Sequence, residues 1–237
     1  MNIQGASALV TGAGRGIGRA IAVALGRAGA HVTAVSRTAV DLDSLVSEID
    51  AAGGHAHAHP GDLLDPRICE GAVRAATAHG RLQILVNNAG IGAHGALADM
   101  SDVEWDQVIG LNLTSVFRVT RAALPDLSQG GGHIFMISSL AGSNAIANMA
   151  AYCASKAALD HMSRCLMLEV RHRGVKVTTI APGSVDTGFG GTARSGETDW
   201  MLRPEDVADA VLDLLASRDG AHLSRVEMRP QAPKPRG

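Results

Sequence analysis

Short apolar runs alternate with longer amphipathic stretches along almost the whole chain of 237 residues. Most of these runs are apolar throughout, which is typical of strands in a parallel sheet that helices cover on both faces. The stretches between them repeat apolar residues at helical spacing, as Leu42, Leu45 and Ile49 do. The sequence therefore predicts a single-domain, doubly wound α/β (Rossmann) fold with about seven parallel strands and helices on both faces.

The expected strands are residues 6–10, 31–35, 55–59, 83–87, 133–137, 175–180 and 225–228. The expected helices are residues 16–28, 41–52, 66–79, 102–127, 150–173 and 204–216. Irregular segments at 92–101, 140–149 and 187–203 follow the fourth, fifth and sixth strands. Because ligands bind at the carboxyl edge of such a sheet, we expect these segments to surround a ligand.

One domain is expected over residues 1–229, because neither an internal repeat nor a linker interrupts the alternation. Residues 230–237 are rich in proline, which predicts a mobile tail.

Composition excludes several classes of function. The formal net charge is -2 and the arginines are spread along the sequence, so no nucleic-acid partner is expected. The first residues lack a charged region followed by an apolar run, and no apolar run reaches the roughly 18 residues of a membrane span. Cys69, Cys153 and Cys165 have no CxxC spacing and fit reduced thiols. We therefore expect a cytoplasmic protein that does not bind membranes.

A glycine-rich turn stands between the first expected strand and the first expected helix. It runs from Thr11 to Gly18 with the pattern TGxxxGxG. Glycines allow the backbone to turn tightly and approach a pyrophosphate, which the free N–H groups of the helix N-terminus bind. The stretch predicts a dinucleotide site, with a tight turn that binds no ligand as the alternative.

The end of the second strand bears on the type of dinucleotide. An NAD site would place an acidic residue here to bind the ribose 2′-hydroxyl. The chain instead has Ser36 and Arg37, and the next acid is Asp41. Arg37 and Arg15 could hold a 2′-phosphate by charge-assisted hydrogen bonds, so NADP(H) is preferred over NAD(H). Two solvated surface arginines are the alternative.

Two further stretches follow the third and fourth strands. Asp62 and Leu63 are placed to bind an adenine, and the run Asn87 to Gly90 puts small residues at the edge of the sheet. Asn, Asp and Gly also favour turns, so both stretches have a purely structural alternative.

Tyr152 is the only tyrosine, and Lys156 lies four residues later. Residues at this spacing share one face of a helix. A nearby ammonium favours the ionised phenol and lowers its pKa, which suits the tyrosine to general acid–base work. A surface tyrosine beside a solvated lysine is the alternative for the pair taken alone.

Taken together with Asn112, Ser139 and the pair Pro182–Gly183, these motifs resemble the short-chain dehydrogenase/reductases. The resemblance extends from about residue 7 to residue 228. It implies a catalytic set of four side chains, with Ser138 as the alternative to the serine. The set is Asn112, Ser139, Tyr152 and Lys156.

The resemblance also implies how the cofactor is held. Pro182 and Gly183 open the stretch that holds the nicotinamide, with Val185 and Thr187 at its carboxamide. The residues expected to bind the cofactor are Gly12, Arg15, Gly16, Ile17, Gly18, Ser36, Arg37, Asp62, Leu63, Asn88, Ala89, Gly90, Tyr152, Lys156, Pro182, Gly183, Val185 and Thr187.

In the chemistry that this resemblance implies, hydride passes between the nicotinamide and a carbonyl carbon. Tyr152 is the general acid or base, and Ser139 holds the carbonyl oxygen. Lys156 lowers the pKa of the tyrosine and hydrogen-bonds the nicotinamide ribose. Asn112 orders a water molecule.

The expected activity is reduction of a small-molecule carbonyl, or oxidation of the alcohol, with similarity to 3-oxoacyl-(acyl carrier protein) reductases. One alternative is an NAD(H)-dependent dehydrogenase of a sugar alcohol, steroid or other secondary alcohol. Another is a non-catalytic dinucleotide sensor. Relatives commonly pair two of their helices across two-fold axes, which implies a homodimer or homotetramer.

His55, His57 and His59 alternate along one expected strand and could project from one face. Three such ligands could hold a metal ion. Histidines on an edge strand are the favoured interpretation, and no metal site is expected.

Overall fold

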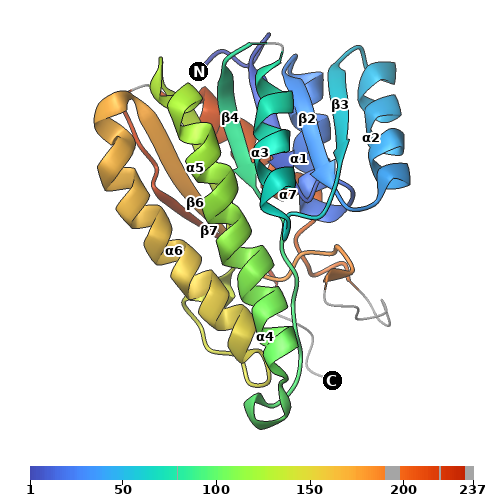
Figure 1. Cartoon of the computed structure of the whole chain (residues 1–237), viewed down its shortest axis with the longest axis vertical. Coiled ribbons are helices and arrows are strands. Elements are labelled where there is room, and N and C mark those ends of the chain that lie inside the picture. Colours follow the sequence, from blue (N-terminus) through green and yellow to red (C-terminus); the bar gives the residue numbers. More distant parts are fainter. Residues whose placement is uncertain (79, 190–197, 219, 233–237) are drawn as a thin grey trace.

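The computed structural model describes residues 1–78, 80–189, 198–218 and 220–232. Seven strands form one sheet, and every pair of neighbours is parallel. The strands are β1 (Ser7–Thr11), β2 (His31–Ser36), β3 (His55–Pro60), β4 (Leu82–Asn87), β5 (Gly132–Ile137), β6 (Val175–Pro182) and β7 (Arg225–Met228). Their order is β3-β2-β1-β4-β5-β6-β7 (Figure 1). The predicted doubly wound fold is confirmed.

Helices cover both faces of the sheet. They are α1 (Gly16–Arg27), α2 (Ala39–Ala51), α3 (Pro66–Thr77), α4 (Asp102–Ile109), α5 (Ser115–Ser128), α6 (Ala150–Val170) and α7 (Pro204–Ala216). Buried residues of α1, α2 and α7 form one core cluster with the sheet, and those of α3, α5 and α6 form the second. In Figure 1, α3, α5 and α6 lie in front of the sheet.

Each central strand contributes to both clusters. In β1, Ala8 and Val10 pack into the first cluster and Leu9 into the second. The burial of both faces explains why these strands are apolar at nearly every position.

The prediction of one uninterrupted helix over 102–127 is wrong. A π-helical turn, Gly110–Thr114, separates α4 from α5. Asn112 lies within this turn, and its side chain hydrogen-bonds to the backbone of Ile91 on the neighbouring loop. The hydroxyl of Ser115 donates to the Leu111 carbonyl, 2.6 Å away, so local side-chain bonds accompany the change in helical geometry. Single π turns often mark functional positions.

The predicted helix 150–173 also ends early. α6 stops at Val170 and continues as the 3₁₀ turn Arg171–Arg173. Gly174 then adopts a φ of 75°, which reverses the chain into β6. Of the predicted segments, 187–203 includes residues 190–197 and the tail 230–237 includes residues 233–237, which lie outside the described residues.

The order of the strands creates a switch point between β1 and β4. The chain moves outward from β1 through β2 to β3, then returns to β4 on the other side of β1. Loops that leave the carboxyl ends of β1 and β4 therefore diverge, and doubly wound folds bind ligands in the resulting crevice. The predicted site residues lie at this edge of the sheet.

β3 is an edge strand that carries the alternating histidines. Ala56 and Ala58 pack against the first core cluster, and His55 and His57 are exposed. His55 stacks on His31 of β2 with ring centroids 5.1 Å apart. Among the described residues, no three His, Cys, Asp or Glu side chains are grouped so that they could hold a metal ion. Within the same residues, every helix is too short or too polar to cross a bilayer.

One buried histidine makes the stability of the fold sensitive to acid. The His133 imidazole hydrogen-bonds the Thr178 hydroxyl at 2.8 Å, and that hydroxyl donates to the Leu223 carbonyl. Because Thr178 gives its proton to Leu223, Nε2 of His133 must carry the proton in this pair. Burial, with smaller effects of Lys176 and His222, lowers the pKa of His133 to about 3.

We expect this histidine to destabilise the protein below pH 6.5. The unfolded chain binds the proton at an ordinary pKa, whereas the folded chain resists it down to about pH 3. Stability is complete above the unfolded pKa, and by pH 5 the free energy of unfolding falls by about 2 kcal/mol. Urea titrations at pH 7 and pH 5 measure the fall.

The matched variant is His133→Gln, whose amide keeps a donor for Thr178 but does not titrate. Between pH 7 and pH 5, the free energy of unfolding of this variant should fall by about 2 kcal/mol less than that of the parent. The exposed His161→Gln serves as control. An equal loss in the parent and in His133→Gln would contradict the assignment.

Candidate active site

The glycine turn is fastened to the end of β4 by Thr11 and Asn88. The Thr11 hydroxyl accepts hydrogen bonds from the backbone N–H groups of Asn88 and Ala89, at 3.0 and 3.2 Å. The Asn88 amide donates to the carbonyls of Thr11 and Gly12, at 3.0 and 3.1 Å. The two loops that flank the switch point therefore form one rigid unit.

The glycines in this turn are required by its geometry. Gly12 has a φ of +67°, and a Cβ there would stand 2.8 Å from the Asn88 amide nitrogen and the Ala89 Cα. Gly16 has a φ of +56°, and a Cβ there would stand 3.1 Å from the Thr187 side chain. A Cβ on Gly18 would clash with the Gly12 carbonyl. The turn is a backbone cradle that a side chain would fill, which fits a pyrophosphate.

The N-terminus of α1 is left without a side-chain cap. Arg15, the N-cap residue, makes no capping hydrogen bond, and the first turn contains no acid. By contrast, Asp65 caps α3, and Ser101 forms a capping box with Glu104 on α4. An uncapped N-terminus at the glycine turn leaves backbone N–H groups for an anion.

Arg15 and Arg37 are exposed beside this turn. Neither guanidinium has an ion pair or hydrogen bond with any other described residue. Ser36 lies close to Gly14, since a Cβ on that glycine would be 2.9 Å from the Ser36 hydroxyl. Asp41 also lies there, with its Cβ 3.2 Å from the same position. Both the basic and the acidic candidates for ribose recognition are thus near the turn.

Asp62 and Leu63 leave β3 in a tight turn. The Asp62 carboxylate accepts a hydrogen bond from the Leu64 N–H at 3.0 Å, which is the turn-forming role that its residue type allows. Leu63 is buried, and its carbonyl accepts a hydrogen bond from the Cys69 thiol. Their contact with an adenine stays a prediction.

Tyr152 and Lys156 lie on α6, and both are almost fully buried. The side chain of Ser139, which follows β5, lies near the Tyr152 phenol and acts to lower its pKa. The Lys156 nitrogen is 5.8 Å from the centre of the tyrosine ring and donates to the Ile137 carbonyl at 2.9 Å. Three of the four residues predicted to be catalytic therefore converge at the end of β5.

The pKa of Tyr152 lies above its ordinary value because the phenol is buried, while the nearby Ser139 side chain acts in the opposite direction. The net lowering of this pKa that the Tyr–Lys pair predicted is therefore wrong, since desolvation is the largest effect on the buried phenol. Burial lowers the pKa of Lys156 itself to about 8, against a smaller opposing effect of Asp160.

Asn112 completes the set from the π turn. Its side chain bonds the Ile91 N–H and carbonyl at 2.8 and 2.9 Å, and donates to the Ser155 hydroxyl at 3.0 Å. Gly90 separates Asn112 from Lys156, because a Cβ on Gly90 would be 3.1 Å from the Asn112 oxygen and 3.7 Å from the lysine nitrogen. Ser155, which lies between Tyr152 and Lys156, was not among the predicted site residues, because no motif in the sequence marks it.

The two neighbouring serines point to different groups. Ser138 is buried, and its hydroxyl is 3.5 Å from the Lys156 carbonyl. The Ser139 hydroxyl accepts the Ala141 N–H at 3.1 Å, and Ser139 is the serine that affects the pKa of the Tyr152 phenol. The geometry therefore favours Ser139 over Ser138 as the partner of the tyrosine.

Pro182 ends β6, and the chain then turns across the switch point. The Gly183 N–H donates to the Met228 carbonyl at 2.8 Å. Val185 packs against the first core cluster, and Thr187 contacts Gly16 of the glycine turn. The residues predicted to hold the nicotinamide thus lie between the glycine turn and the end of β6.

An ion pair that the sequence did not predict joins three elements behind the tyrosine. Arg225 of β7 pairs with Asp160 of α6 at 2.6 Å, and its other nitrogen donates to the Ser143 hydroxyl at 2.9 Å. Asp160 is buried, and Ser143 follows the turn that contains Ser139. Arg225 therefore connects β7, α6 and the loop after β5.

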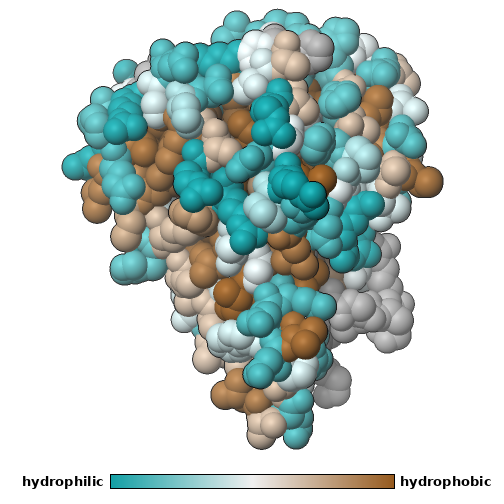
Figure 2. Space-filling model, in the orientation of Figure 1, coloured by the Kyte–Doolittle hydropathy of each residue, from teal (hydrophilic) through white to brown (hydrophobic). Residues whose placement is uncertain are grey.

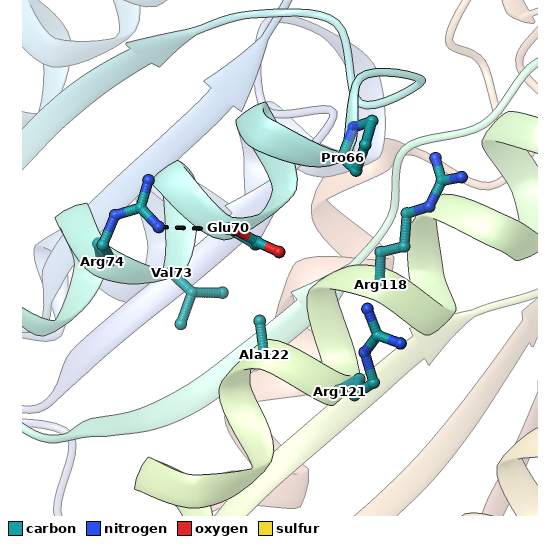
Figure 3. A pocket seen from close by; sticks show the side chains of 7 residues that line it. All are labelled: Pro66, Glu70, Val73, Arg74, Arg118, Arg121 and Ala122. Carbon is teal, nitrogen blue, oxygen red and sulfur yellow. Dashed lines mark ion pairs between the residues drawn. The ribbon is translucent and has the colours of Figure 1, made fainter.

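Two other surface features lie apart from these residues. Figure 3 shows a pocket between α3 and α5 that contains none of the predicted site residues. It is lined by Pro66, Glu70, Val73, Arg74, Arg118, Arg121 and Ala122. Apolar surface is also visible on the face that carries α4, α5 and α6 (Figure 2). Trp105 of α4, Phe117 of α5 and Leu168 of α6 are exposed apolar side chains.

Comparisons with known proteins agree with this geometry. Residues 6–198 match the family model described as short chain dehydrogenase. Sepiapterin reductase of Chlorobaculum tepidum is 33% identical, and the match covers 94% of this chain and 95% of that protein. The 2,3-dihydro-2,3-dihydroxybenzoate dehydrogenase of Bacillus subtilis is 34% identical, with 92% of each chain covered.

A solved structure gives the same result. A metagenomic short-chain oxidoreductase in complex with NADP is 39% identical, with a TM-score of 0.86, and the match covers 98% of this chain and 100% of that one. The chain belongs to the short-chain dehydrogenase family of NAD(P)-dependent oxidoreductases.

Proposed function

We propose that this protein reduces the carbonyl group of a small molecule to an alcohol, or catalyses the reverse reaction, with NADP(H). The observation that carries this proposal is the buried Tyr152 phenol, which has the Ser139 side chain and the Lys156 ammonium beside it. It lies at the same sheet edge as a glycine cradle that fits a dinucleotide. The related metagenomic enzyme crystallised with NADP also supports this choice of cofactor.

A bound nicotinamide supplies hydride chemistry at the carbonyl carbon. The backbone of the glycine turn would hold the pyrophosphate of the cofactor, and the stretch from Pro182 to Thr187 would hold the nicotinamide ring. The protein's own task is to stabilise and protonate the carbonyl oxygen. The Ser139 hydroxyl orients that oxygen, and the Tyr152 phenol donates a proton to it.

The electrostatics of the site suit proton donation at neutral pH. The raised pKa of Tyr152 keeps the phenol protonated, which supplies the proton but makes the phenol a weaker acid. After donation the phenolate is left in a buried place, where a nearby ammonium stabilises it. Lys156 uses one donor on the Ile137 carbonyl and keeps two others, one of which can reach a ribose hydroxyl.

Carbonyl reduction is therefore expected to slow as the pH rises through about 8. Below this pKa Lys156 is protonated and stabilises the phenolate, and above it the positive charge is lost. The profile of kcat against pH in the direction of reduction measures this decline. A rate that stays level or increases up to pH 10 would contradict this role for Lys156.

The preference for NADPH over NADH is expected to depend on Arg37. The Arg37→Ala variant loses charge-assisted hydrogen bonds, so its KM for NADPH should rise about 10- to 100-fold. The KM for NADH should change little. Arg27→Ala, at the other end of α1, is the matched control.

An NAD(H)-dependent dehydrogenase of a sugar alcohol, steroid or other secondary alcohol is the second candidate. Asp41 favours it, because this acid lies beside Gly14 and could bind a free ribose hydroxyl. Under this alternative, Asp41→Asn raises the KM for NADH, and Arg37→Ala leaves the KM for NADPH unchanged.

The proposal is tested by NADPH oxidation with a panel of ketones, aldehydes and β-ketoesters, with NADH in parallel. We expect consumption of NADPH that requires a carbonyl substrate, with one alcohol formed for each NADPH. Tight cofactor binding without turnover on any of them would instead indicate a non-catalytic dinucleotide sensor.

We further propose a cytoplasmic homodimer or homotetramer with one domain over residues 1–229. Trp105 of α4 and Leu168 of α6 are apolar and exposed, and their burial between subunits would be favourable, which supports self-association. Sedimentation of the purified protein measures the oligomeric state.

A further inference from the structure

Phe189 lies against the tyrosine of the proposed site. The centres of the two rings are 5.6 Å apart and the ring planes are tilted by 52°. The Phe189 N–H donates to the Thr187 hydroxyl at 3.2 Å, which fixes the start of its segment beside the glycine turn. The chain has only six aromatic residues of the Phe, Trp and Tyr types, and two of them meet here.

Two other loops border the same ring. A Cβ on Gly92 would lie 3.2 Å from the edge of the Phe189 ring, so the loop after β4 packs against it. The Gly95 N–H donates to the Asn148 carbonyl at 2.9 Å and joins that loop to the loop after β5. The segments after β4, β5 and β6 thus meet around Tyr152, as the sequence predicts, and Phe189 contributes an aromatic side.

Packing does not bury the Phe189 ring completely. Phe189 keeps 42% of its surface exposed, whereas Tyr152 beneath it keeps 9%. An exposed aromatic ring beside a proton donor offers a flat apolar surface to whatever approaches that donor. Aromatic groups gain more from such a surface than saturated groups of similar size, because ring pairs interact beyond their buried area.

We propose that Phe189 selects substrates whose carbonyl group is attached directly to an aromatic ring. This rests on the proposed carbonyl reduction at Tyr152 and assigns the class of substrate to it. The substrate ring packs on Phe189 and the carbonyl oxygen then lies toward Tyr152 and Ser139. Gly92 leaves room for the Phe189 ring and the substrate ring, since a side chain at position 92 would press on Phe189.

The test compares acetophenone with cyclohexyl methyl ketone, which has the same carbon skeleton without aromaticity. Phe189→Leu keeps apolar bulk and removes the ring, so kcat/KM for acetophenone should fall about 2- to 10-fold more than for the saturated ketone. Phe117→Leu removes an equally exposed ring on α5 and should change neither value. Equal falls for both ketones, or no fall, would overturn the proposal.

A second readout does not need turnover. Benzamide and cyclohexanecarboxamide carry the same two ring types on a carbonyl that resists reduction, and calorimetry measures their binding to the NADPH-loaded protein. Benzamide should bind more tightly to the parent, and Phe189→Leu should remove the difference. If no ketone is reduced, the proposed function fails, and amide binding still decides the role of Phe189. Equal affinities of both amides for the parent would overturn that role.

Discussion

Replacement of Tyr152 by phenylalanine is expected to lower kcat for carbonyl reduction by about 10²- to 10⁴-fold. The ring and its packing remain, including its contact with Phe189, but the hydroxyl beside Ser139 is lost. Negative charge that develops on the carbonyl oxygen then has no buried proton donor. The affinity for NADPH should change by no more than a few-fold, because the glycine turn and its anion-binding N–H groups are untouched. Stopped-flow kinetics and fluorescence titration measure the two quantities.

Cys153→Ala is the matched control for this variant. Cys153 is the next residue on α6 and is half-buried, and its thiol donates to the Asn144 carbonyl over a long distance of 3.9 Å. Its kcat should stay close to that of the parent. A Tyr152→Phe enzyme that also keeps kcat within a few-fold of the parent would exclude the tyrosine as proton donor.

Replacement of Arg225 by methionine should lower the free energy of unfolding by about 3–5 kcal/mol, because it leaves a buried charge without its partner. Asp160 has only 5% of its surface exposed, and its second oxygen already has no partner among the described residues. Chemical denaturation at pH 7 measures the loss.

Two further variants separate this pair from surface electrostatics. Arg229→Met removes an exposed pair with Glu227 and should cost about 1 kcal/mol or less. Asp160→Leu combined with Arg225→Met removes both charges and should recover much of the lost stability. A loss below about 1 kcal/mol for Arg225→Met alone would show that Asp160 finds another partner or water.

The positions of the strands along the chain and their approximate ends could be predicted because burial on both faces leaves a direct mark on the sequence. His31–Ser36 extends one residue beyond its expected end, and Val175–Pro182 extends two. Both extensions lie at the carboxyl edge, where loop residues continue the hydrogen bonding of the sheet. The interruption around Asn112 could not be predicted, since it depends on contacts with Ile91 across the fold.

The candidate site also has features that can be predicted from the sequence and features that cannot. Glycines that the backbone geometry requires, and side chains at one helical spacing, are visible in the sequence, as Gly12, Gly16, Tyr152 and Lys156 show. The direction in which the Tyr152 pKa shifts is not visible in the sequence, because burial is a tertiary property that no local pattern reports. The same holds for Arg225, which lies 65 residues from Asp160.

The most direct test of the proposed reduction uses NADPH that carries deuterium at the transferable position of its nicotinamide ring. After turnover of a ketone that the protein reduces, mass spectrometry of the alcohol is expected to find one deuterium at the carbinol carbon and none on its oxygen. An alcohol without deuterium at that carbon, formed while the labelled cofactor is consumed, would contradict hydride transfer to a carbonyl in this protein.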